Sequence, residues 1–163
     1  MWLSDRRTLL LAALALGACG FTPVYGPQGS GGTLVDSVLL PEPGRPESYL
    51  FNRRFEERLG RAPATAPYRL TLQLQTTEQG IGSTSAGSTT RFRVIGRAFY
   101  TLTDTATEAV LAEGRTNAFT GYSTTGSTVA TLAAERDATE RLMVLLADQV
   151  IDHLLLETAA EAG

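Results

Sequence analysis

Few residues in this chain could carry out chemistry. The 163-residue sequence holds one histidine, His153, and one cysteine, Cys19. His153 follows Asp152 near the end of a long predicted helix. The helix dipole favours a histidine at that position, so its presence there requires no catalytic role. One histidine cannot assemble a zinc or copper site, and the absence of lysine excludes a P-loop. The sequence therefore predicts no catalytic residue, no metal site and no cofactor.

Cys19 ends a segment that has the features of a secretory signal. Charged residues precede an apolar run over 9–16, which is too short for the roughly 20 residues that cross a bilayer. Residues 16–19, Leu-Gly-Ala-Cys, resemble the bacterial lipobox, in which the cysteine receives a diacylglyceryl group before the signal is cut. We therefore predict cleavage between Ala18 and Cys19 and lipidation of Cys19. The alternatives are an ordinary signal with an incidental cysteine, or a frayed N-terminal helix.

Composition indicates one globular domain behind this signal. Hydrophobic residues make up 43% of the chain and charged residues 19%, which is ordinary for a folded protein. The net charge of −3 argues against general nucleic-acid binding. We expect a signal peptide over 1–18, a lipidated flexible tether over 19–32, where proline and glycine are frequent, and a single domain over 33–163.

Hydrophobic periodicity in the domain predicts a strand, a helix, three strands and a long helix. Their expected ranges are 33–40, 47–60, 68–75, 91–103, 110–122 and 127–160. The Gly/Ser/Thr-rich stretch 80–90 suits either a mobile loop or a polar extension of the strands. Two helices on one face of a mostly antiparallel four-stranded sheet, an α+β fold, is the arrangement that this order favours.

The same periodicity predicts which side chains face the core. In the first helix these are Phe51, Phe55 and Leu59. In the strands they are Tyr68, Leu70, Leu72, Leu74, Phe92, Val94, Ala98, Tyr100, Leu102, Val110, Ala112, Thr116 and Ala118, and in the last helix Leu132, Leu142, Leu145, Leu146, Val150 and Leu154.

Arg91, Arg93 and Arg97 share one face of the predicted strand over 91–103. Ile95 and Phe99 lie in the same row. Guanidinium groups with apolar neighbours suit a phosphorylated amphiphile such as a lipid head group, because arginine forms charge-assisted bidentate hydrogen bonds with phosphate. The alternative is a solvent-facing strand whose arginines prevent aggregation at a sheet edge.

Residues 19–26, Cys-Gly-Phe-Thr-Pro-Val-Tyr-Gly, are similar to the start of mature lipopolysaccharide-assembly lipoproteins of the LptE family, in its alphaproteobacterial form. Residues 130–138 and the segments Arg141-Leu142 and 146–150 resemble the C-terminal helix of that family. The family packs two helices on a four-stranded sheet, which agrees with the order of elements predicted from periodicity.

The resemblance implies a lipoprotein at the periplasmic face of the outer membrane and no enzymatic activity. Such a protein assists the assembly of the LptD β-barrel translocon, plugs it and binds lipopolysaccharide on its way to the cell surface. Gly20 is consistent with outer-membrane sorting. Because family contacts to lipopolysaccharide are made by basic residues, we nominate Arg91, Arg93 and Arg97 for that role. The alternative is an auxiliary periplasmic lipoprotein of an ABC-type lipid transporter. No nucleic-acid partner is expected.

Overall fold

The computed structural model describes residues 31–85 and 87–161. The predicted signal peptide, Cys19 and the tether up to residue 30 lie outside the described residues. The elements, in chain order, are α2 (Gly31–Leu34), β1 (Val38–Leu39), α3 (Pro46–Leu59), β2 (Tyr68–Ser83), β3 (Thr89–Asp104), β4 (Val110–Ser123) and α4 (Thr128–Glu161).

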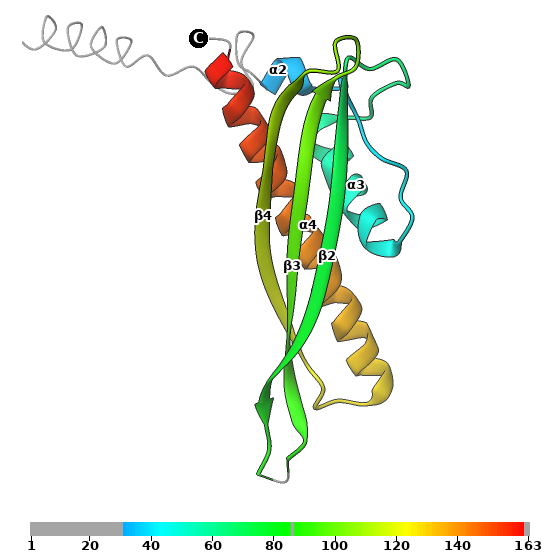
Figure 1. Ribbon diagram of the computed structural model, residues 1–163. Coiled ribbons are helices and arrows are strands. Elements are labelled where there is room, and N and C mark those ends of the chain that lie inside the picture. Colours follow the sequence, from blue (N-terminus) through cyan, green and yellow to red (C-terminus); the bar gives the residue numbers. More distant parts are fainter. Residues whose placement is uncertain (1–30, 86, 162–163) are drawn as a thin grey trace, which may run out of the picture.

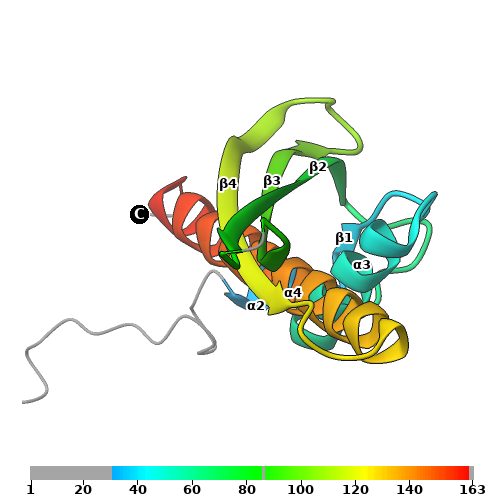
Figure 2. The same cartoon turned by 90° about the horizontal axis from the view of Figure 1, so that it is seen from below.

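The strands form one sheet in the order β1-β2-β3-β4 (Figure 1). The β1–β2 pairing is parallel, and the longer β2–β3 and β3–β4 pairings are antiparallel. Figure 2 shows α3 and α4 on the same side of the curved sheet. The structure therefore confirms the predicted α+β fold with two helices on one face of a mostly antiparallel sheet.

The strand predicted over 33–40 is largely wrong. Residues up to Leu34 form the short helix α2, and only Val38 and Leu39 join the sheet. Between them Asp36 adopts a positive φ of 53°, which turns the chain. The main-chain N–H of Asp36 donates a hydrogen bond of 2.7 Å to the carbonyl of Leu59, at the end of α3. The turn at Asp36 therefore interrupts the strand and caps the neighbouring helix.

Helix α3 agrees with its prediction. Pro46 occupies the first turn, where its missing N–H costs nothing, and the Ser48 hydroxyl accepts the main-chain N–H of Arg45 at 3.1 Å. Gly60 ends the helix with a φ of 78°. The predicted stripe of Phe51, Phe55 and Leu59 is buried in the core.

The polar stretch 80–90 extends the strands and does not form a long loop. β2 continues to Ser83 and β3 begins at Thr89, with a short turn between them. Figure 1 shows this hairpin reaching past the first turn of α4, so its end has no helix beneath it. Alternation along β2 and β3 is as predicted: Leu70, Leu74 and Ala98 face the core, with the other predicted residues of these strands buried or half-buried beside them.

The predicted inward set of β4 is wrong at Val110. The register shifts between Leu102, which pairs with Ala112, and Thr103, which pairs with Val110. Leu111 is therefore the extra residue of a β-bulge and packs against the core in place of Val110. Val110 is 55% exposed, whereas Ala112, Thr116 and Ala118 are buried as predicted.

Helix α4 packs against β4 and β3 and supplies much of the core. Leu142, Leu146, Val150 and Leu154 are fully buried, as predicted. The prediction fails for Leu132 and Leu145, which are 45% and 43% exposed. Leu132 lies in the first turns of α4, at the end of the molecule where the hairpin projects (Figure 1).

Leu145 lies on the side of α4 that also carries the exposed Arg141 and Asp152, at helical spacings of four and seven residues. The core instead includes Met143 and Ile151, which the expected stripe omitted. In the part of the chain that the structure describes, no helix has both the length and the apolar character needed to cross a membrane.

Candidate ligand-binding face of the sheet

The helices leave one face of the sheet uncovered, and we call it the outer face (Figure 2). Its residues follow from the strand register and the alternation of side chains. It carries five arginines but a single carboxylate, that of Glu113, although the whole chain has a net charge of −3. The arginines are Arg69, Arg91, Arg93, Arg97 and Arg115.

The predicted row of Arg91, Arg93 and Arg97 runs along the middle of the outer face on β3. This strand is paired with β2 on one side and with β4 on the other. Arg97, for example, lies between Gln75 and Asn117. Because β3 is a central strand, its arginines do not protect a sheet edge, which removes the alternative explanation of the row.

Other arginines contact the strands that do form the edges. The Arg45 guanidinium donates to the main-chain carbonyl of Leu74 on β2 at 3.1 Å, and Arg141 donates to that of Gly121 on β4 at 3.4 Å. Both carbonyls belong to strands with a long unpaired side. Protection of the edges is therefore provided from the helical layer and not from the row on β3.

The arginine row has apolar contacts but no carboxylate partners. The Arg93 guanidinium lies 5.0 Å from the ring centroid of Phe119, which is 64% exposed on β4. Phe119 is the cross-strand neighbour of Ile95. Among the described residues, the ion pairs involve the helices and the loop that follows α3, and none includes the row. The row therefore offers uncompensated positive charge beside apolar surface.

A hollow of about 440 Å³ lies on the same face, farther from the hairpin. The outer-face side chains that line it come from all three long strands: Thr71, Gln73, Phe99, Thr101, Glu113 and Arg115. Phe99 is half-buried at its centre, with Gln73 on one side and Arg115 on the other.

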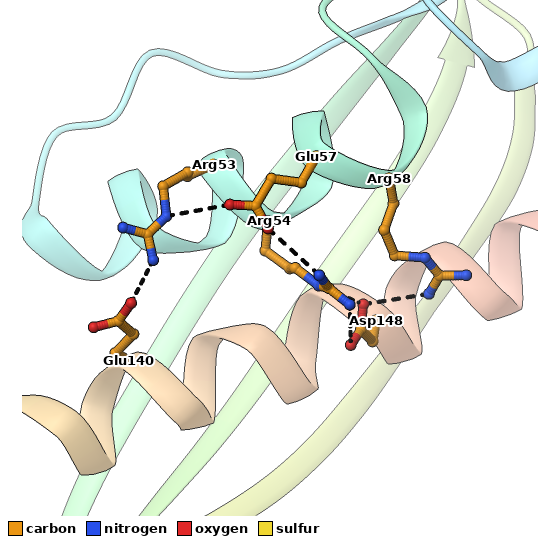
Figure 3. A network of polar contacts seen from close by, with 6 residues as sticks. All are labelled: Arg53, Arg54, Glu57, Arg58, Glu140 and Asp148. Carbon is orange, nitrogen blue, oxygen red and sulfur yellow. Dashed lines mark hydrogen bonds and ion pairs between the residues drawn. The ribbon is translucent and has the colours of Figure 1, made fainter.

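The helical layer is held together by a second group of arginines (Figure 3). Arg54 of α3 donates two hydrogen bonds to the Asp148 carboxylate of α4, at 2.9 and 3.1 Å. Arg58 reaches the same carboxylate at 3.3 Å and Asp152 at 3.0 Å, and Arg53 pairs with Glu140. The hydrogen bond that Arg54 donates to the Asp148 carboxylate raises the pKa of Arg54. These contacts fix α3 on α4 and keep both helices on one side of the sheet.

A model of lipopolysaccharide-assembly proteins, the LptE family, matches residues 41–154 of the chain. The chain belongs to the LptE family. Comparison with curated proteins gave no match. The matched range holds α3, all three long strands and α4 as far as residue 154, so the outer face lies entirely within the LptE-like region.

Solved structures share the fold of this LptE-family chain at low sequence identity. A candidate lipoprotein from Caulobacter crescentus is 21% identical, with a TM-score of 0.66 over 81% of this chain and 96% of its own. Rare lipoprotein B from Shewanella oneidensis is 12% identical, with a TM-score of 0.51 over 77% and 92%. A minor lipoprotein from Acinetobacter baumannii is 13% identical, with a TM-score of 0.53 over 76% and 93%. At these identities the likeness establishes the fold alone.

Sequence reasoning missed Arg69, Arg115 and Phe119, which extend the site of this LptE-family protein beyond one strand. Each looked unremarkable within its own strand. They join the row only through the cross-strand register, for example the pairing of Arg115 with Phe99. The strands expected over 91–103 and 110–122 follow one another in the chain, but the β-bulge at Leu111 changes their register, and periodicity does not report it.

His153 lies on the covered side of the sheet, away from the outer face. Its Nδ1 is 3.1 Å from the Tyr100 hydroxyl, and burial raises the pKa of Tyr100. Gly114 leaves room for this contact, since a Cβ there would lie 2.5 Å from the Tyr100 hydroxyl. His153 thus joins helix to sheet. The described residues include no cluster of three or more side chains that could bind a metal ion.

Proposed function

We propose that this chain is an outer-membrane lipoprotein that binds lipopolysaccharide through the outer face of its sheet and works with an LptD-type β-barrel. The observation that carries the proposal is the uncompensated arginine row on an uncovered central strand. Membership of a lipopolysaccharide-assembly family supports the identity of the ligand.

The chemistry of the row suits the phosphorylated head group of lipopolysaccharide. A guanidinium group donates paired hydrogen bonds to phosphate oxygens and keeps its charge at any physiological pH. Ile95 and Phe119 lie among the arginines and provide apolar contacts beside the phosphates. Because Arg91 and Arg97 are solvent-exposed, the attraction of the row for phosphate should weaken as salt concentration rises.

The test of this site is a double charge reversal, Arg91→Glu with Arg93→Glu. We expect binding of purified lipopolysaccharide to weaken roughly tenfold or more, since each charged hydrogen bond contributes about 1.5–3 kcal/mol. The matched control reverses Arg61 and Arg136, which are exposed and lie outside the outer face. Equal affinity for lipopolysaccharide in both double variants, with folding unchanged by circular dichroism, would show that the row does not bind it.

The barrel partner is proposed from the surface at the hairpin end of the molecule. The end of the β2–β3 hairpin is polar and free of helical cover (Figure 1). Polar residues also line the interior of outer-membrane β-barrels. We therefore expect the chain to assist assembly of the barrel and to plug its lumen. Co-purification in mild detergent should recover a large β-barrel protein. Recovery of an inner-membrane ATPase system instead would indicate an auxiliary component of a lipid transporter.

The proposed anchor is a lipid on Cys19, after removal of residues 1–18, and residues 19–32 would link it to the domain that follows. A single acyl chain gives only marginal membrane binding. A diacylglyceryl group together with an amide-linked acyl chain provides more than one chain and so a stable anchor. The Cys19→Ser variant should therefore remain uncleaved or appear in the soluble fraction. Partitioning of processed Cys19→Ser protein into outer-membrane fractions at the normal level would contradict lipidation.

A further inference from the structure

The hollow on the outer face has a different composition from the arginine row. It is built from two neighbouring cross-strand rows, in which Gln73, Phe99 and Arg115 lie side by side, and Thr71, Thr101 and Glu113 lie next to them. Three strands span about 10 Å and two rows are separated by about 7 Å, so the patch matches one or two sugar rings in size.

The side chains of the hollow match the chemistry of a saccharide. The ring of Phe99 offers a flat apolar surface to the C–H groups of a pyranose. Around it, hydroxyl, amide, carboxylate and guanidinium groups provide both donors and acceptors for sugar hydroxyls. Phe99 is thus the one apolar outer-face side chain of the hollow, among five polar ones.

Glu113 gives the hollow a different ligand preference from that of the arginine row. It is the only carboxylate among the outer-face residues of the three long strands, and it lies in the hollow. A carboxylate accepts hydrogen bonds from sugar hydroxyls but repels phosphate. The outer face thus has a region of uncompensated positive charge around Arg91 and Arg93, and a region where the charge of Glu113 offsets that of Arg115 and hydroxyl groups are accepted.

We propose that the hollow is a saccharide subsite, which holds sugar rings of the same glycolipid whose phosphates contact the arginine row. The inference rests on the proposed function, because it extends the lipopolysaccharide site to a second region. Phe99 and Arg93 are six residues apart on β3, or about 20 Å along the strand. One extended head group can therefore reach both regions.

The probe for this subsite is core oligosaccharide of lipopolysaccharide, freed of lipid and of phosphate. It is titrated into the full chain in detergent, and saturation-transfer NMR follows binding. The wild type should bind it saturably, and high salt should change the affinity little because no phosphate is present. Phe99→Leu should weaken binding roughly three- to tenfold, as expected for loss of an aromatic contact.

Phe119→Leu is the matched control, since it makes the same change on the same face but lies under Arg93 and outside the hollow. It should leave oligosaccharide binding unchanged. Glu113→Gln serves as a second variant that keeps the shape of the side chain, and it should also weaken binding. Equal weakening by Phe99→Leu and Phe119→Leu, or no saturable binding to the wild type, would overturn the subsite.

Intact lipopolysaccharide distinguishes failure of the subsite from failure of the proposed function. If the Arg91/Arg93 reversal weakens lipopolysaccharide binding while the oligosaccharide does not bind, the subsite is wrong and the proposed function stands. If neither lipopolysaccharide nor the oligosaccharide binds, the proposed function itself fails.

Discussion

The contact between α3 and α4 should depend on Asp148 much more than on Asp152. Asp148 accepts hydrogen bonds from Arg54 and Arg58 (Figure 3). Asp152 accepts one from Arg58 alone. The two carboxylates also differ in exposure, since the side chain of Asp148 is 27% exposed and that of Asp152 is 59% exposed. Replacing each by alanine therefore compares a half-buried cluster with a surface pair on the same helix.

The expected free-energy changes follow from these contacts. A charged hydrogen bond contributes about 1.5–3 kcal/mol, and an exposed ion pair about 0–1 kcal/mol, so the half-buried Asp148 should contribute about 2 kcal/mol. Alanine has a better helix propensity than aspartate by about 0.5 kcal/mol, which leaves a net loss of about 1.5 kcal/mol for Asp148→Ala. For Asp152→Ala, the loss of the ion pair with Arg58 and the gain in helix propensity should cancel to within about 0.5 kcal/mol.

Urea unfolding followed by circular dichroism measures both variants. Asp148→Ala should lower the unfolding free energy by about 1.5 kcal/mol and the melting temperature by about 5 °C, while Asp152→Ala stays near the wild type. High salt should reduce the effect of Asp148→Ala only in part, since the cluster is half-buried. If the two variants lose equal stability, the bidentate contact to Arg54 does not hold α3 on α4 and the reasoning is wrong.

Two further predictions test the core and the open end of the sheet. Gly96→Val should lower the unfolding free energy by about 2 kcal/mol, because a Cβ at Gly96 would lie 2.8 Å from Leu146 Cδ1, whereas Gly44→Val, with no atom within 4 Å of its Cβ, should cost much less. Burial and the hydrogen bond to Glu78 raise the pKa of Tyr122 to about 12, from an ordinary 10.0. Its contribution to stability is complete below pH 10 and is lost as pH rises towards 12. Absorbance titration of the wild type, compared with that of Tyr122→Phe, should show this pKa. Glu78→Gln should lower the pKa of Tyr122 while leaving it above 10.0. An unchanged pKa of Tyr122 in Glu78→Gln would exclude the contact.

Much of the fold could be predicted from local pattern, because each long element buries one face. In β2 and β3 the period-two alternation arises because one face of each strand is buried. The same holds for the stripe of Phe51, Phe55 and Leu59 on α3. The failures occur where the boundary between core and solvent changes along one element. Leu132 fits the helical spacing of the core stripe but has no sheet beneath it. Val110 fits the period-two alternation expected for β4, but the bulge at Leu111 shifts the register and leaves Val110 exposed.

The candidate site could likewise be predicted from the sequence only in part. The row on β3 was visible because its members lie two or four residues apart in one strand. The hollow was not, since its six outer-face side chains come from three strands and meet only through the register. Register depends on turn geometry and bulges, which periodicity does not report. The saccharide subsite therefore required the structure, whereas the phosphate region did not.

The partners of the arginines provide the strongest argument for a ligand on the outer face. Arg54 of the helical layer has the Asp148 carboxylate as its acceptor within the chain, and Arg45 has the carbonyl of Leu74. The row on β3 forms none of the ion pairs found among the described residues, and its like charges repel one another along a central strand that needs no edge protection. Stability of the fold does not account for such an arrangement. An anionic ligand outside the chain accounts for it, because binding would neutralise the charges that the fold leaves uncompensated.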